Sequence, residues 1–128
     1  MSYSIDRLFP DATLDQIDPR TRAALTANGF GVLTEIDVQA TMKKKLDKDL
    51  PGYRILGACH PGHAYRALTA EPRIGTMLPC NVILREVDGG VEVSAVDPVA
   101  SMKAVGNPEV SAAMAEVKAI LTRVIAAI

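Results

Sequence analysis

The chain has 128 residues, the size of a single domain, and we expect residues 1–128 to fold around one core. Hydrophobic residues make up 48% of the sequence and charged residues 23%, an ordinary globular balance that argues against a disordered chain. Fourteen Lys and Arg against fifteen Asp and Glu give a formal net charge of -1, which argues against nucleic acid as a partner.

Three further features bear on where the protein works. No apolar run approaches the roughly 18 residues that a membrane-spanning helix needs, so we expect no membrane contact. The first residues lack the basic and then apolar layout of a secretory signal. Two cysteines are too few for a disulfide scaffold and are typical of a reducing compartment, which predicts a cytoplasmic protein.

The first predicted elements are a strand and a helix. Residues 3–9 alternate weakly between two faces, which indicates a strand. The next stretch has helical spacing, but Pro19 would lose a hydrogen bond in a helix interior. We therefore predict that the helix begins at Pro19, with Asp18 as its N-cap, and ends at the Asn-Gly pair at residues 28–29.

A second strand and a short helix are predicted next. Residues 30–38 alternate in the manner of a strand. Asp37 is placed to cap a helix in which Val38, Met42 and Leu46 recur every four residues. The spacing predicts that these three side chains are buried.

A third strand and a third helix follow. Residues 53–59 are predicted to form the strand, and residues 61–71 the helix, because a proline in the first helical position favours a helix start. The predicted inward positions of this helix are Ala64, Ala67 and Leu68.

Residues 80–87 and 91–97 form the clearest strand pair, because the Asp-Gly-Gly sequence between them suits a tight hairpin. Alternation along both strands predicts one buried face and one polar face. The predicted buried face consists of Cys80, Val82, Leu84, Val91, Val93 and Ala95.

The last helix is predicted to begin at Pro108, after an N-cap at Asn107. It carries one apolar stripe at helical spacing and is long enough to cross a whole sheet. The stripe consists of Val110, Ala113, Met114, Val117, Ile120, Leu121, Val124 and Ile128.

The elements together predict the order β-α-β-α-β-α-β-β-α. The hairpin and the long final helix favour an α+β fold over a parallel α/β sheet. We expect a single-layer mixed or antiparallel sheet of four to five strands, with helices packed mainly on one face and a long C-terminal helix. The other face would be partly solvated or buried in a dimer.

Candidate site residues cluster after the third strand. The chain has two histidines and two cysteines, and Cys59, His60 and His63 lie within five residues, while Cys80 begins the hairpin. Cys59 precedes a helix start, where free N–H groups and the helix dipole favour a thiolate. Cys59 is therefore a candidate nucleophile or redox sulfur, with Cys80 as its resolving partner.

The same four residues allow other interpretations. Cys59, His63 and Cys80, with His60 as a fourth ligand, offer sulfur and nitrogen donors that suit Zn(II) or Cu(I), although their spacing is no recognised zinc pattern. Free cysteines are also common core residues, His60 could cap the helix, and His63 could face water.

Several motifs occur in a fixed order along nearly the whole chain. They are residues 29–38, residues 53–59, Pro61, Ala64, Ile74 with Gly75, residues 78–82, Gly89 and residues 91–98. With these motifs the sequence resembles the domain of unknown function 302 family of small bacterial and archaeal proteins. The resemblance implies a compact α+β domain that tends to form homodimers, and it implies no activity.

Three residues depart from the family pattern. Position 60 is usually Asn in that pattern and is His60 here, and His63 is not part of the pattern, so a metal site using both would be particular to this chain. Pro19 falls where the pattern has uninterrupted helix, which bears on where the first helix begins.

Three hypotheses for function follow. The first is a homodimeric module that binds a small molecule or a protein partner in a cleft near Cys59 and Cys80, without turnover. The second is a thiol-dependent redox or nucleophilic protein that uses these two cysteines. The third is a soft-metal site formed by Cys59, His63 and Cys80.

Overall fold

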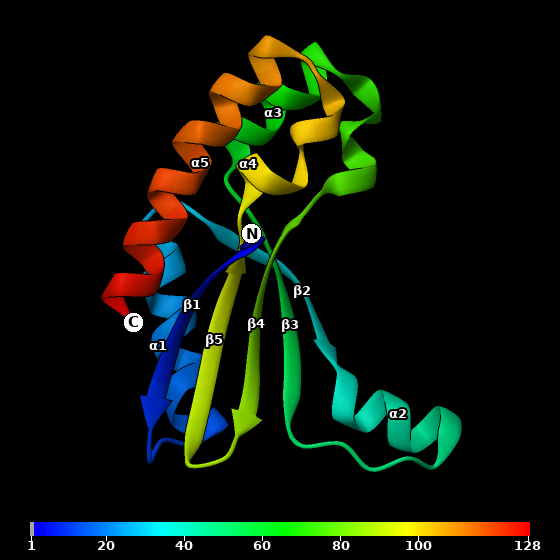
Figure 1. Cartoon of the computed structure of the whole chain (residues 1–128), viewed down its shortest axis with the longest axis vertical. Coiled ribbons are helices and arrows are strands. Elements are labelled where there is room, and N and C mark those ends of the chain that lie inside the picture. Colours follow the sequence, from blue (N-terminus) through cyan, green and yellow to red (C-terminus); the bar gives the residue numbers. More distant parts are fainter. Residues whose placement is uncertain (1) are drawn as a thin grey trace.

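The structure is a computed structural model that describes residues 2–128. Its elements, in chain order, form one body with a single sheet (Figure 1). They are β1 (Ser4–Pro10), α1 (Leu14–Ala27), β2 (Gly31–Asp37), α2 (Val38–Leu46), β3 (Tyr53–Cys59), α3 (Pro61–Ala70), the 3-10 helix η1 (Pro72–Met77), β4 (Cys80–Val87), β5 (Gly90–Val96), α4 (Pro98–Ser101), the 3-10 helix η2 (Lys103–Val105) and α5 (Pro108–Ala127).

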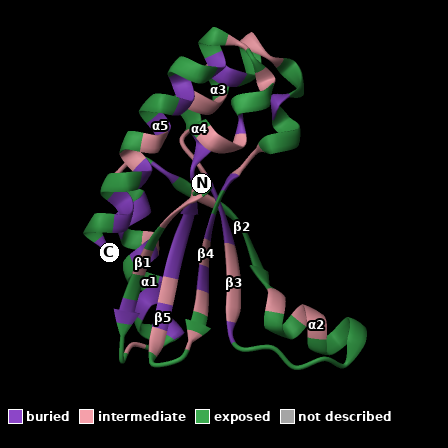
Figure 2. Cartoon of the chain, viewed as in Figure 1, coloured by how far each residue is buried: buried purple, intermediate pink, exposed green. Residues whose placement is uncertain are grey.

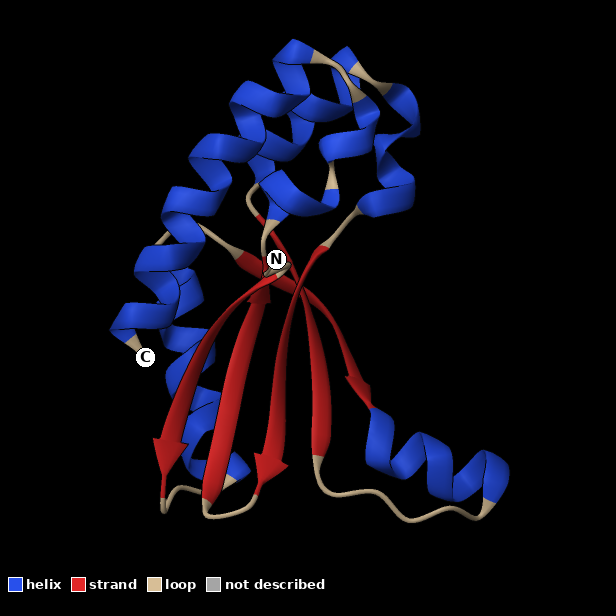
Figure 3. Ribbon diagram, in the orientation of Figure 1, coloured by secondary structure: helices blue, strands red, loops and turns tan. Residues whose placement is uncertain are grey.

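The five strands form one antiparallel sheet in the order β1-β5-β4-β3-β2 (Figure 3). The predicted α+β class, strand number and long C-terminal helix are confirmed. The predicted hairpin joins β4 to β5, and its turn contains Gly89 at φ +78°, a conformation that glycine adopts without strain.

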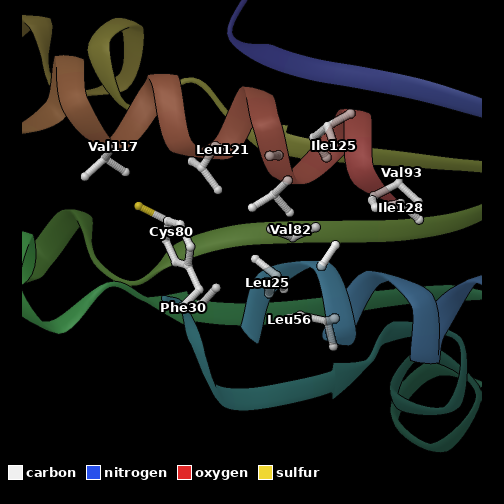
Figure 4. Packing of buried hydrophobic residues seen from close by; sticks show 14 of the residues in the cluster. Leu25, Phe30, Leu56, Cys80, Val82, Val93, Val117, Leu121, Ile125 and Ile128 are labelled. Carbon is white, nitrogen blue, oxygen red and sulfur yellow. The ribbon is translucent and has the colours of Figure 1, made fainter. Parts of the chain in front are cut away.

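The core lies between one face of the sheet and the helices α1 and α5. All six residues of the predicted hairpin face are buried, and the inward stripe of α5 is buried along most of its length (Figure 2). Figure 4 shows Leu25 of α1 and Leu121 of α5 packed over Val82 of β4. Among residues 2–128, no helix is both long enough and apolar enough to cross a bilayer.

The predicted start of the first helix is wrong. The helix α1 begins at Leu14, and Pro19 lies inside it. A capping box starts the helix: the Thr13 hydroxyl accepts from the Gln16 backbone N–H at 3.3 Å, and the Gln16 side chain accepts from the Thr13 N–H at 3.0 Å. Buried side chains occur before and after the proline, so packing outweighs the one lost hydrogen bond.

The predicted burial of the short helix is also wrong. Asp37 caps α2 as expected, accepting from the Ala40 N–H at 2.9 Å. However, α2 projects from the edge of the sheet (Figure 1) and has no buried residue; Leu46 is 63% exposed. The four-residue spacing identified the apolar face, but Val38 and Met42 on it are only half-buried and Leu46 is exposed, because α2 lies at the edge of the fold.

Candidate functional site

A pocket of about 260 Å³ lies where β3 ends and β4 begins, beside α3 and α5. The four residues nominated from the sequence, Cys59, His60, His63 and Cys80, all line it. The rest of the lining is almost wholly apolar and includes Phe30, Leu68, Leu78, Met114 and Val117. The fold therefore gathers the predicted site residues around one cavity.

Strand pairing brings the two cysteine segments together. In the β3–β4 ladder Ala58 pairs with Cys80, so Cys59 is adjacent in sequence to the cross-strand partner of Cys80. Successive strand residues point to opposite faces, and the side chain of Cys59 therefore leaves the sheet on the face opposite to that of Cys80. Side chains that leave a sheet in opposite directions are poorly placed for a disulfide.

The two thiols have different environments. Cys80 is 7% exposed, and its sulfur points toward Val117 of α5 in Figure 4. Burial, and next the neighbouring Cys59, raise the pKa of the Cys80 thiol to about 11. Cys80 is thus a thiol at neutral pH. Cys59 is half-buried, and both cysteines are free.

The two histidines contact each other directly. His60 occupies the N-cap position of α3 without making a side-chain capping bond, and its Nδ1 lies 2.9 Å from the Nδ1 of His63, one turn later. The His63 Nε2 lies 3.3 Å from a carboxylate oxygen of Glu116 on α5. The same oxygen accepts a hydrogen bond from Arg66 at 2.6 Å. The site therefore contains a chain of polar groups, His60–His63–Glu116.

The imidazole of His60 lies against apolar groups. Its ring meets Phe30 edge to face, with centroids 5.2 Å apart. Burial, and next the neighbouring His63, lower the pKa of His60 below its ordinary value. The surroundings therefore favour a neutral His60 at neutral pH.

The predicted metal site remains a prediction. Among residues 2–128, no three or more His, Cys, Asp and Glu side chains are arranged to hold a metal ion. The two histidine rings do converge, and the carboxylate on the outer nitrogen of His63 resembles the support that metal-bound histidines commonly receive. The fit to Zn(II) or Cu(I) is partial, because the two sulfurs diverge from the sheet.

Sequence reasoning missed the residues that complete the site. Glu116 is on the exposed side of α5, and 52 residues of chain lie between it and His63. No local pattern distinguishes it from other exposed acids. Phe30 falls within the predicted strand of residues 30–38, and strand periodicity gives no sign that it lines a pocket. Only the packing of α3 against α5 identifies Glu116 as a partner of His63.

The fold and site together define a small α+β domain with an apolar pocket at one end of an antiparallel sheet. The family model of domain of unknown function DUF302 matches residues 9–128, and the chain therefore belongs to the DUF302 family. A crystal structure of an uncharacterized conserved DUF302 protein from Bacillus stearothermophilus has a TM-score of 0.90 and 20% identity, with 98% of each chain covered. At that identity the likeness shows the fold alone. No curated protein matches the chain.

Proposed function

We propose that the protein binds a small, mainly apolar molecule in the pocket between β3, β4, α3 and α5. The observation that carries this proposal is the chemistry of the lining, in which apolar side chains surround one linked pair of histidines. Apolar concavities with a few oriented polar groups are the usual form of small-molecule sites. The volume of about 260 Å³ suits a ligand smaller than a typical drug.

A pocket-filling variant tests the proposal. Ala64 lines the pocket from α3, and Ala64→Phe would occupy the cavity, whereas Ala119→Phe adds the same group on an exposed position of α5. The probe is 4-ethylphenol, followed by protein-observed NMR titration. We expect saturable shifts at pocket residues in the wild type and in Ala119→Phe, and their loss in Ala64→Phe. Equal binding by all three proteins, or by none, contradicts the proposal.

We also infer that the protein forms a homodimer through the uncovered face of its sheet. On that face Ile36 pairs with Ile55, and Ile55 pairs with Ile83, so three isoleucines form one row across β2, β3 and β4. Ile36 is 46% exposed. An apolar row on an exposed sheet face is typical of an interaction surface. A monomer mass in light scattering at micromolar concentration would contradict this inference. Ile83→Glu should dissociate the dimer, whereas the control Val99→Glu, at an exposed position outside the sheet, should not. A dimer that is equally stable in both variants would also contradict the inference.

Thiol chemistry at Cys59 is the second candidate function. Cys59 lines the pocket, half-buried, at the start of α3, whereas Cys80 is buried with a pKa of about 11. A reactive sulfur at neutral pH would therefore be Cys59, acting without a resolving partner on its own sheet face. The cytoplasmic location stays a prediction from the sequence, in which two cysteines are typical of a reducing compartment. Alkylation of Cys59 no faster than that of a free thiol would exclude this function.

A further inference from the structure

The residues that line the pocket differ in how deeply they lie. Three of them are exposed at the surface: Leu33 of β2, which is 67% exposed, Leu68 of α3 and Gly75 of η1. We call these three residues the mouth of the pocket. Five others are buried, none of them more than 7% exposed, and we call them its floor. The floor consists of Phe30, Ala58, Cys80, Met114 and Val117. The cavity therefore runs from the surface into the interior of the domain.

The main core closes the pocket behind its floor. The sulfur of Cys80 on β4 points toward Val117 on α5 (Figure 4). Farther along the same two elements, Val82 and Leu121 are fully buried and belong to the core cluster. Because protein cores are close-packed, a ligand can enter at the mouth but cannot pass beyond the floor.

Polar side chains are confined to the intermediate depth of the pocket. In the part of the chain that the structure describes, His60 and His63 are the only lining side chains with a nitrogen atom, and none contains oxygen. Both histidines are half-buried, whereas the floor side chains consist of hydrocarbon and sulfur. A polar group of a ligand that reached the floor would lose its water and find no polar side chain there, which is unfavourable.

We propose that the pocket binds amphiphilic molecules with the hydrocarbon tail inward, so that the tail lies on the floor and the polar end stays toward the mouth. This inference rests on the proposed binding function and names its ligand class, a molecule with one apolar tail and one polar end. Cys80 and Val117 determine the length of tail that fits, because these two side chains meet at the inner end of the pocket.

A series of straight-chain alcohols from 1-butanol to 1-decanol tests the closed floor, with affinity measured by protein-observed NMR titration. In the wild type, each added methylene should raise the affinity about fourfold, as burial of one CH₂ group predicts. The gain should stop at the tail length that reaches the floor, which we call the length limit. An affinity that rises evenly through 1-decanol overturns the closed floor.

The same titrations separate this inference from the proposed binding function. If 4-ethylphenol binds in the pocket and no straight-chain alcohol does, the tail-inward inference is overturned and the proposed function stands. If neither kind of probe binds, both are overturned.

The two cysteines provide a matched pair of variants. Both line the pocket, but Cys80 is in the floor and Cys59 is half-buried, so Cys80→Ala and Cys59→Ala delete the same sulfur atom at different depths. We expect Cys80→Ala to move the length limit about one carbon longer and Cys59→Ala to leave it unchanged. Val117→Leu adds one carbon to the floor and should move the limit about one carbon shorter, an independent result if Cys80→Ala does not fold. An unchanged limit in the folded floor variants overturns the role of these residues.

Intermolecular nuclear Overhauser effects from bound 1-octanol measure the orientation directly. We expect the terminal methyl group of the alcohol to contact the methyl groups of Met114 and Val117 in the floor. The CH₂ group that carries the hydroxyl should contact Leu33 or Leu68 at the mouth instead. The reverse pattern, or equal contacts of both ends with the floor, overturns the tail-inward orientation.

Discussion

Asp18 is the residue whose replacement best tests how the first helix is anchored. Its carboxylate lies 2.6 Å from the Arg22 Nε and 3.0 Å from the Arg54 Nη1, so it joins α1 to β3. Arg22 also contacts Glu35 on β2 at 3.1 Å, and Arg54 contacts Asp15 at 3.1 Å. The sequence predicts Asp18 to be a helix cap, whereas the structure makes it the centre of this ion network.

The magnitude follows from two charge-assisted hydrogen bonds, each contributing roughly 1.5–3 kcal/mol. Part of this is recovered in Asp18→Asn, because the amide oxygen still accepts and because the side chains of Arg22 and Arg54 are 35% and 25% exposed to water. We expect the free energy of unfolding to fall by about 2 kcal/mol, a decrease in Tm of about 8 °C for a chain of this length.

The pH dependence gives a second measurement. Burial alone raises the pKa of Asp18, but the hydrogen bonds and charges of Arg22 and Arg54 outweigh it and lower the pKa below its ordinary value. A carboxyl with a lowered folded pKa stabilises fully above its unfolded pKa, about 3.9, and this stability is lost as the pH falls through the folded pKa. The Tm difference between wild type and Asp18→Asn should therefore be constant from roughly pH 5 to 7 and shrink below about pH 4.

Thermal unfolding followed by circular dichroism at pH 6 is the assay, and Asp15→Asn is the matched control. Asp15 contacts the same Arg54, but its side chain is 91% exposed, so we expect its replacement to cost less than about 0.5 kcal/mol. Equal decreases in Tm for the two variants would refute the claim that the buried position of Asp18 gives the network its strength.

Three further predictions concern the thiols, the core and the soft-metal hypothesis. At pH 8, iodoacetamide should label Cys59 but not Cys80 in the folded protein, because Cys80 is buried and its thiol has a pKa of about 11. After denaturation both cysteines should be labelled. Mass spectrometry of proteolytic fragments measures the labelling, and equal labelling of the two cysteines in the folded protein contradicts the prediction. Leu121→Ala should lower the free energy of unfolding, measured with urea, by about 3 kcal/mol, because Leu121 is fully buried. The control Leu46→Ala, at an exposed position, should lower it by less than about 0.5 kcal/mol. Equal urea midpoints for the two variants would contradict the assignment of Leu121 to the core. If the soft-metal hypothesis holds, elemental analysis of protein purified without a histidine tag should find Zn or Cu. Cys59→Ser and His63→Gln should each abolish this metal content. A wild-type protein without metal excludes the hypothesis.

Local patterns in the sequence determined much of the fold. The Asp-Gly-Gly turn and the alternation from Cys80 to Ala95 predicted the hairpin and its buried face, because turn chemistry and strand period are properties of neighbouring residues. The stripe along α5 predicted its inward side for the same reason. The sequence also indicated the candidate site, since Cys59, His60 and His63 are neighbours in the chain.

Tertiary structure decided where those elements meet. Only the packing of α3 against α5 brings Glu116 to His63, and only the β3–β4 register brings Cys80 beside the end of β3 while directing its thiol away from that of Cys59. It also decided that α2 lies exposed despite its apolar spacing. The reason is physical: periodicity reports which side of an element is apolar, whereas a pocket depends on contacts between segments that no local pattern relates.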